Sequence, residues 1–337
     1  MARTLTGFVR GTYADPTPFW ETGARLDQYG INAVFVHSGS ITADLVARAR
    51  AEGANVYAEF ATLNGKGYVD QHPEAWPVDE RGEKAAAATW FMGACPTDPG
   101  FRAHRLRGLE ELLQQFDLDG VWMDYLHWHA QFEDPKPVLP ETCFSATCVE
   151  EFSKRTGIRV PEGSTARRAQ WILRRHDEEW RDWRCTVLAG WASEIRTVIQ
   201  KTRPGILLGN FQCPWRDEDF GGARRRILGV DITLLAALVD VMSPMAYHGR
   251  MGRPPSWVGE SVAWLSGHIG STQPQIWPIV QARPEPQHIS AEEFGDVMSR
   301  ARSAGASGLM MFTIESVAAD PRKLTVLRDL YARWARE

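Results

Sequence analysis

The sequence has no apolar run long enough to cross a membrane. Its most apolar stretch, residues 227–246, is interrupted by Asp231 and Asp240, whereas a membrane-spanning helix needs about 18 uninterrupted apolar residues. The first residues, Met-Ala-Arg-Thr-Leu-Thr-Gly, lack the apolar segment of a secretory signal. We therefore expect no membrane partner and a cytoplasmic location. The alternative that stays open is a secretion signal trimmed from this chain.

Concentrated positive charge is also lacking. The 337 residues carry 38 Lys and Arg against 42 Asp and Glu, a formal net charge of −4 at pH 7. The basic run at residues 224–226 is too short for a surface that binds nucleic-acid phosphates. We therefore expect no nucleic-acid partner. The fractions of charged residues, 24%, and hydrophobic residues, 44%, exclude disordered and collagen-like chains.

Cysteine is scarce, with five residues in a chain long enough to bury a proper core. A disulfide scaffold is therefore unnecessary, and we expect reduced thiols. Cys143 and Cys148 lack the spacing and the second Cys/His pair of a zinc knuckle. The sequence thus predicts no metal and no other cofactor, and it gives no indication of the oligomeric state.

Short apolar runs alternate with amphipathic stretches along the whole chain. The runs predict eight strands, at residues 6–10, 33–37, 55–60, 120–125, 206–211, 240–247, 275–281 and 308–314. The amphipathic stretches predict helices at residues 43–52, 101–115, 167–201, 256–268, 292–304 and 322–336.

This alternation predicts an α/β protein of the (β/α)8 TIM-barrel class. We expect residues 1–337 to form one barrel domain, with long inserts at about 61–99 after the third strand and 126–165 after the fourth. The competing doubly wound sheet is disfavoured because the sequence has neither a G-x-G-x-x-G motif after the first strand nor a P-loop.

Tryptophan is abundant, with 14 residues. Aromatic rings offer apolar faces that suit the C–H faces of sugars. We therefore expect aromatic side chains of the two inserts to form much of a carbohydrate-binding cleft, chiefly Trp76, Trp90, Trp128 and Phe132.

Polar side chains follow most of the predicted strands. In a barrel the carboxyl ends of the strands converge on one site. Tyr13 and Asp15 follow the first strand. The candidates for contact with an oligosaccharide or glycoside substrate are His37, Glu59, Trp90, Tyr125, His127, Trp128, Asn210, Gln212, Tyr247, His248 and Gln281.

Two carboxylates stand out among the strand ends. Asp124 closes the run Asp-Gly-Val-Trp-Met-Asp, and Glu315 follows the eighth strand. Glycoside hydrolysis uses one protonated carboxyl group to assist the leaving oxygen and one ionised carboxylate as nucleophile or base. We expect Asp124 and Glu315 to be this catalytic pair, with the two roles not assigned between them.

Three segments resemble known hydrolases. Residues 116–125, Phe-Asp-Leu-Asp-Gly-Val-Trp-Met-Asp-Tyr, resemble the fourth-strand motif of TIM-barrel glycoside hydrolases. Residues 241–247 resemble the sixth-strand Met-x-Tyr segment of the chitinase-like family 18 barrels. Residues 143–157 are similar to a Cys-rich insert of such hydrolases. The resemblance implies a TIM-barrel glycoside hydrolase with Asp124 as a carried-over acid. The Glu that the chitinase pattern has two residues later is Leu126 here.

Two other functions remain as alternatives. One is a carbohydrate-binding protein with a hydrolase-like fold but no activity. The other is a metal-dependent barrel hydrolase or isomerase that uses Glu59, Asp124, His127 and His129 as ligands. A serine hydrolase is disfavoured because no G-x-S-x-G motif is present.

Overall fold

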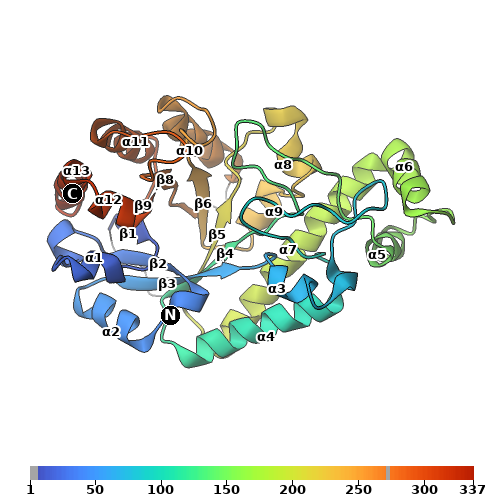
Figure 1. The fold of residues 1–337 in the computed structure, drawn as a ribbon, viewed down its shortest axis with the longest axis horizontal. Helices are drawn as coiled ribbons and strands as arrows, with labels where there is room; N and C mark the ends of the chain where they lie inside the picture. The colour runs from blue at the N-terminus through green and yellow to red at the C-terminus, as the bar shows by residue number, and fades with distance from the viewer. Residues whose placement is uncertain (1–6, 271–273) are drawn as a thin grey trace.

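The strands of the computed structural model, which describes residues 7–270 and 274–337, close into a parallel barrel (Figure 1). From β1 to β6 each strand pairs with the next along the chain, β8 pairs with β6 and β9, and β9 pairs back with β1. The short strands β7 and β8 pair with β6 one after the other and share one barrel position. The predicted (β/α)8 class is confirmed. The strands are β1 Val9–Tyr13, β2 Ala33–His37, β3 Asn55–Ala61, β4 Gly120–Asp124, β5 Leu207–Gln212, β6 Val241–Ala246, β7 Gln275–Ile276, β8 Ile279–Gln281 and β9 Gly308–Phe312.

Helices surround the barrel, with both long inserts on its right-hand side in Figure 1. The longer helices are α2 Ala43–Ala51, α4 Pro99–Gln115, α5 Ala146–Thr156, α6 Thr165–Arg175, α7 Asp177–Thr202, α10 Ser256–His268, α11 Ala291–Ser303 and α13 Pro321–Trp334. The short helices are α1 Thr17–Glu21, α3 Lys66–Val69, α8 Ala223–Arg226, α9 Ile232–Ala236 and α12 Ile314–Ala318. Among the described residues, no helix combines the length and the apolar character needed to span a membrane.

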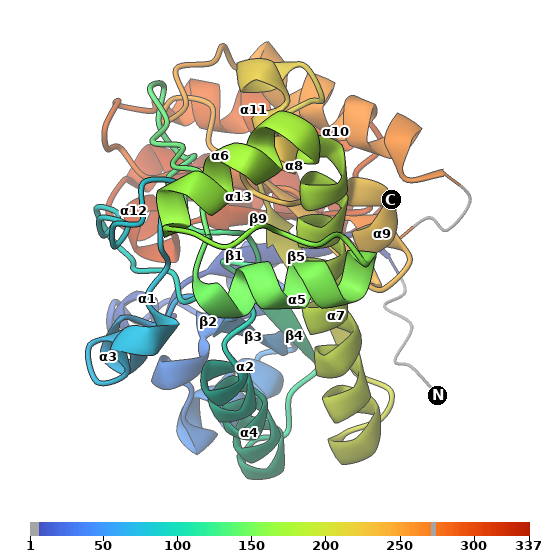
Figure 2. The same cartoon turned by 90° about the vertical axis from the view of Figure 1, so that its right-hand side faces the viewer.

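Among the predicted elements that differ from the structure are the first strand and the longest helix. The first strand, predicted at 6–10, is β1 at Val9–Tyr13, and Thr6 lies outside the described residues. The predicted helix 167–201 is two helices, because His176 leaves the helical conformation at φ −143° and ψ 33° between α6 and α7. Figure 2 shows α5 and α6 lying outside α7, where they form an outer layer of the second insert.

Large aromatic rings fill the barrel below its open end. Trp122 of β4 stacks on Trp277 at 5.4 Å, and Phe35 of β2 stacks on Tyr57 of β3 at 4.8 Å. The ring of Trp122 lies so close to Gly209 that a Cβ there would stand 2.1 Å from it. Only glycine therefore fits at this position of β5. The packed core leaves room for a site only at the carboxyl ends of the strands.

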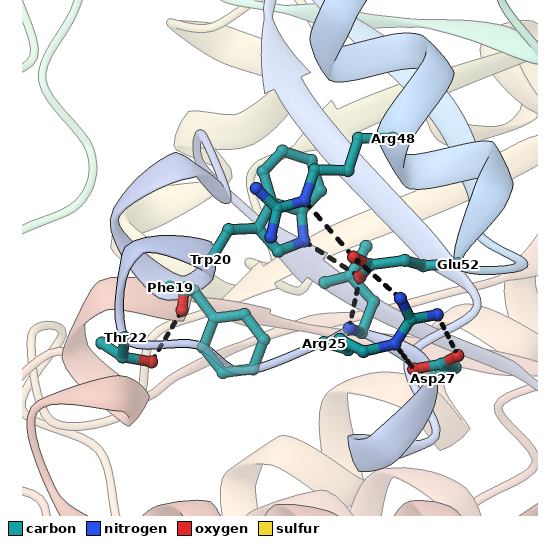
Figure 3. Close-up of polar contacts among 8 residues, drawn as sticks. Phe19, Trp20, Thr22, Arg25, Asp27, Arg48 and Glu52 are labelled. Atoms are coloured by element: carbon teal, nitrogen blue, oxygen red, sulfur yellow. Dashed lines mark hydrogen bonds and ion pairs between the residues drawn. The ribbon is translucent and has the colours of Figure 1, made fainter.

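The buried carboxylate of Glu52, at the end of α2, holds the connection from α1 to β2 (Figure 3). Its Oε2 accepts hydrogen bonds from Trp20 Nε1 at 3.0 Å and from the backbone N–H of Leu26 at 2.7 Å. Arg48 pairs with Oε1 at 3.3 Å. The carboxylate thus satisfies two buried donors that have no strand or helix partner.

Candidate active site

A cavity of about 540 Å3 opens at the carboxyl ends of the strands. Both inserts contribute to its walls, and aromatic rings alternate there with charged groups. We call it the central cavity. Its lining residues are Tyr13, Thr89, Trp90, Asp124, Tyr125, Glu133, Asp134, Phe211, Met245, Tyr247, Arg250, Ile279, Arg283, Glu285, Pro286 and Phe312.

Asp124, the last residue of β4, lies in this cavity. Its Oδ1 accepts a 2.7 Å hydrogen bond from the backbone N–H of Tyr125. Burial raises the pKa of Asp124 well above its ordinary value, and the negative charges of Glu59 and Glu133 raise it further. The Asp124 carboxyl group therefore holds its proton to higher pH than an exposed aspartate does.

Glu59 lies behind the cavity wall in β3. Its Oε2 accepts a 2.7 Å hydrogen bond from the hydroxyl of Tyr13. Burial raises the pKa of Glu59, while the Tyr13 hydrogen bond and the nearby His37 act in the opposite direction. Tyr13 thus separates Glu59 from the cavity and favours its charged form.

Glu133, from the second insert, is a cavity carboxylate that the sequence analysis missed. Burial raises its pKa, and the positive charge of Arg250 opposes that rise. Arg250 Nη1 lies 3.5 Å from Glu133 Oε2. The guanidinium also lies 4.2 Å from the ring centroid of Trp90, in a cation–π contact. Arg250 therefore links the two inserts at the cavity rim.

Of the predicted substrate-binding residues, Trp90, Tyr125 and Tyr247 line the central cavity together with Asp124. Trp90 is 37% exposed. Tyr125 has a positive φ of 54°, directly after the end of β4. The structure places these residues at the cavity, and their contact with a substrate stays a prediction.

Glu315, the predicted second catalytic residue, does not line the cavity. The strand predicted to run to residue 314 ends at Phe312, and Thr313 begins helix α12, its hydroxyl accepting a hydrogen bond from the N–H of Ser316. Glu315 therefore lies in the first turn of a helix rather than at a strand end. The structure therefore does not place Glu315 in the cavity with Asp124, as the sequence predicted.

Asn210 and Gln212 are also not among the cavity residues. They flank Phe211 in β5, and Phe211 lines the cavity. Because neighbouring side chains of a strand alternate between its two faces, both polar residues belong to the outer face of the barrel. Both are buried there.

His248 and Gln281 hold loops rather than line the cavity. His248 Nε2 lies 2.9 Å from Glu293 Oε1 of α11. The Gln281 side chain accepts the backbone N–H of Arg250 at 2.9 Å and donates to the backbone oxygen of Arg283 at 3.0 Å. Gln281 thus fixes the two loops that carry Arg250 and Arg283 to the rim.

Trp128, predicted as a sugar platform, is a core residue. It is fully buried, and its indole N–H donates to the backbone oxygen of Arg184 in α7 at 3.2 Å.

Trp76 also lies outside the cavity, and its indole N–H donates to the backbone oxygen of Ala85. Phe132 is buried and, with His127, lines a small space of about 10 Å3 next to Asp124. Of the four predicted platform residues, Trp90 alone lines the central cavity.

His127 is buried and electrically neutral. Its Nδ1 lies 2.8 Å from the backbone oxygen of Trp128. Burial lowers the pKa of His127 to about 4. At neutral pH this residue adds no positive charge beside Asp124.

Both ring nitrogens of His129 have main-chain partners. Nε2 lies 2.7 Å from the oxygen of Ala86, and Nδ1 accepts the N–H of Gly93 at 3.1 Å. Within residues 7–270 and 274–337, Glu59, Asp124, His127 and His129 do not form a group with converging ligand atoms. The four ligands proposed for the metal-dependent alternative are therefore not brought together in the described part of the barrel mouth.

A thiol cluster has the ligand chemistry of a zinc site. In the part of the chain that the structure describes, it is the one group whose ligand atoms converge, all within 4.8 Å of one another: Cys95, Cys143 and Cys148. The sulfur atoms of Cys95 and Cys148 lie 3.4 Å apart, and Cys143 Sγ accepts the N–H of Val78 at 3.3 Å. The cluster lies outside the central cavity and joins the two inserts.

No protein-family model matches this chain, and no curated protein matches it. Solved structures do match. The glycoside hydrolase domain of PgaB (BpsB) from Bordetella bronchiseptica has a TM-score of 0.70 and 16% identity, covering 96% of this chain and 99% of that chain.

Two further structures are larger enzymes. The β-galactosidase from Bacillus circulans sp. alkalophilus has a TM-score of 0.72 and 14% identity, covering 99% of this chain and 57% of that one. The α-L-fucosidase isoenzyme 2 from Paenibacillus thiaminolyticus has a TM-score of 0.62 and 12% identity, covering 97% and 49%. This chain therefore spans about half the length of these two proteins. The predicted resemblance to TIM-barrel glycoside hydrolases is confirmed at the level of the fold.

Proposed function

We propose that this protein is a glycoside hydrolase that cleaves an O-glycosidic bond in the central cavity. The observation that carries the proposal is that Asp124 and Glu133 line one aromatic-walled cavity at the carboxyl ends of the barrel strands. Two carboxyl groups supply the acid and the nucleophile or base of glycoside hydrolysis. Aromatic rings such as Trp90 offer faces on which a sugar can stack.

Asp124 is the proton donor in this proposal. The negative charges of Glu59 and Glu133 oppose the ionisation of Asp124, in addition to the effect of burial. Glu59 has the hydroxyl of Tyr13 to stabilise its charge, and Glu133 has Arg250. Among the described contacts, Asp124 accepts only a backbone hydrogen bond. In this proposal Asp124 is therefore the carboxyl group that carries the proton.

Glu133 is the ionised partner. With Arg250 beside it, its carboxylate keeps a negative charge that can attack the anomeric carbon or activate a water. Glu133 takes the role that the sequence analysis gave to Glu315. The cleaved bond then lies between the Asp124 and Glu133 carboxyl groups.

The test is turnover of a panel of aryl glycosides by wild type, Asp124→Asn and Glu133→Gln. With poor leaving groups, both variants should lose at least about 10²-fold in kcat/KM. With 2,4-dinitrophenyl glycosides, Asp124→Asn should recover most of its rate, because that leaving group departs without a proton. Glu133→Gln should not recover.

Asp134→Asn is the matched control. Its carboxylate also lines the cavity but accepts a backbone hydrogen bond from Lys136. We expect turnover close to wild type. If the wild-type protein binds oligosaccharides yet hydrolyses no glycoside of the panel, the hydrolase proposal is wrong and the carbohydrate-binding alternative holds.

A further inference from the structure

We propose that the substrate is an anionic glycan, whose carboxylate or sulfate groups bind in a second groove beside the central cavity. This inference rests on the proposed function, since it names the substrate class of the same site. The second groove, about 1070 Å3, is formed by the end of β2, the first insert and the start of α4. We call it the basic groove, because its ionisable side chains apart from Tyr68 are His37, Lys66, His72, His104, Arg105 and Arg107.

The basic groove carries an excess of positive charge. No Asp or Glu is among its lining residues. Two of the basic residues have partners outside the groove: Lys66 pairs with Asp70 at 2.8 Å, and His72 Nδ1 lies 3.3 Å from Glu74 Oε1. For Arg105 and Arg107, the described residues place no carboxylate oxygen within 4.0 Å. Arg105 and Arg107 are thus cations of the groove that have no ion-pair partner among the described residues.

Arg105 is the cation that supports the proposal most strongly, because contacts with the groove wall fix its side chain. Its guanidinium lies over the rings of Phe60 and Phe101, at 5.9 and 5.4 Å, and donates to the backbone oxygen of Asn64. Its Nε is buried without a hydrogen-bond partner. A cation held in a partly buried position without a counter-ion is costly, and a bound anion would offset that cost.

Aromatic rings stand next to these charges. Tyr68 stacks on His72 with centroids 4.2 Å apart, and its ring lies 5.1 Å from that of His104. All three rings line the groove. Flat rings beside fixed cations are suited to a sugar that carries a negative group, because the ring contacts the sugar face while the cation pairs with its substituent.

The basic groove adjoins the central cavity across two neighbouring strands. Ala61 lines the groove at the end of β3, and its register partner in β4 is Asp124, which lines the cavity. Neighbouring strands lie about 4.8 Å apart. The groove and the cavity therefore lie at neighbouring strand ends, and in this proposal a glycan with one bond at Asp124 extends from the cavity into the groove.

The central cavity itself is not suited to the anionic groups. Four carboxyl groups line it, against two guanidinium groups: Asp124, Glu133, Asp134, Glu285, Arg250 and Arg283. Like charges would repel a carboxylate or sulfate at the cleavage point. The anionic substituents therefore belong on sugar units at some distance from the cleaved bond.

The test measures binding by the full-length Asp124→Asn protein, so that hydrolysis does not intervene. The probes are polygalacturonate, dextran sulfate and neutral dextran. At least one anionic polymer should bind about tenfold or more tightly than dextran, and its affinity should fall as salt is raised. Binding of polygalacturonate alone assigns a carboxylate substituent, and binding of dextran sulfate alone assigns a sulfate ester.

Two exposed cations of the basic groove are the test positions. Adding Lys66→Gln and Arg107→Gln should weaken anionic-polymer binding about tenfold or more without changing the melting temperature. The matched control is Arg333→Gln, an exposed cation of α13 outside the groove, which should leave the affinity unchanged.

Three outcomes would overturn the inference: dextran bound as tightly as the anionic polymers, equal losses in the groove and control variants, or single-stranded RNA bound more tightly than either glycan. Because this assay needs no turnover, a protein that proves not to hydrolyse glycosides can still pass it. Conversely, a protein that hydrolyses only neutral glycans would fail this binding test and still satisfy the proposed function.

Discussion

The hydroxyl of Tyr13 donates a 2.7 Å hydrogen bond to Oε2 of Glu59, joining the end of β1 to β3 behind the central cavity. This bond favours the ionised form of Glu59. The negative charge of Glu59 in turn raises the pKa of Asp124. A tyrosine that touches one carboxylate therefore acts on the proton affinity of another.

Tyr13→Phe should shift the pH dependence of turnover. Without the hydroxyl, the pKa of Glu59 rises, so Glu59 holds a proton to higher pH and exerts less negative charge on Asp124. The pKa of Asp124 then falls. In a profile of kcat/KM against pH, the basic limb, which reports deprotonation of the acid, should move to lower pH. Tyr29→Phe, outside the site, is the control. An unmoved basic limb in Tyr13→Phe would mean that Glu59 does not tune Asp124.

Trp90 and Trp128 should respond to alanine substitution in opposite ways. Trp90→Ala should weaken oligosaccharide affinity, on the order of 1 kcal/mol, with little change in melting temperature, because its ring lies at the cavity rim. Trp128→Ala should cost about 3 to 5 kcal/mol in unfolding free energy, because the ring is fully buried. Titration calorimetry and urea unfolding separate the two effects. Equal stability losses would contradict the placement of Trp90.

Stability should fall in mild acid because of His127. Its pKa is about 4 in the folded protein and about 6.5 when unfolded. Between these values the unfolded chain takes up a proton that the folded chain does not. The free energy of unfolding should therefore be fully retained above about pH 6.5 and drop by about 2 to 3 kcal/mol towards pH 4.

His127→Gln should remove that part of the pH dependence, as measured by urea unfolding at pH 7 and pH 4.5. His288→Gln, at an exposed histidine, should leave the dependence intact. Parallel curves for wild type and His127→Gln would show that another group causes the acid sensitivity.

Glu52 offers a sharp pair of substitutions. Glu52→Ala leaves the buried N–H groups of Trp20 and Leu26 without an acceptor, and should cost about 2 to 4 kcal/mol in unfolding free energy. Glu52→Gln keeps an oxygen for both donors and loses the ion pairs with Arg48 and Arg25, which lie at the surface, so its cost should be near 1 kcal/mol or less. A similar loss in both variants would place the stabilisation in the charge rather than in the hydrogen bonds.

Removal of residues 320–337 should prevent cooperative folding. Tyr331 of α13 donates from its hydroxyl to the backbone oxygen of Gly11 in β1 at 2.8 Å, and Lys323 donates to the oxygen of Ala282 at 2.8 Å. The deletion would expose the strands where the barrel closes. Removal of residues 335–337 alone should leave a single sharp melting transition. A soluble, cooperatively melting 1–319 fragment would contradict the single-domain prediction.

The fold was largely predictable because buried parallel strands leave near-continuous apolar runs in the sequence. The predicted strand 33–37 matches β2, and the predicted helix 256–268 matches α10. The strand that carries Asp124 was also found, since its apolar run ends directly at the carboxylate. Hydrophobic periodicity was sufficient for these elements.

The cavity walls were harder to predict. The face of a strand that Asn210 and Gln212 occupy depends on register, which the sequence alone did not fix. Glu133 comes from an insert without periodicity, so no pattern placed it beside Asp124. Glu315 does not lie at a strand end for a local reason: Thr313 caps a helix where continued strand was expected. The alternation of Phe211 with its polar neighbours is the signal that would have corrected β5.

The thiol cluster offers a way to measure local opening between the two inserts. Cys95 comes from the first insert, Cys143 and Cys148 from the second, and all three are buried. An alkylating reagent reaches their sulfur atoms when the inserts separate, not while they are packed. The labelling rate of each thiol, followed by mass spectrometry, therefore reports the free energy of that separation independently of global unfolding. The three sulfur atoms at the junction of the inserts are therefore also the probes of their separation.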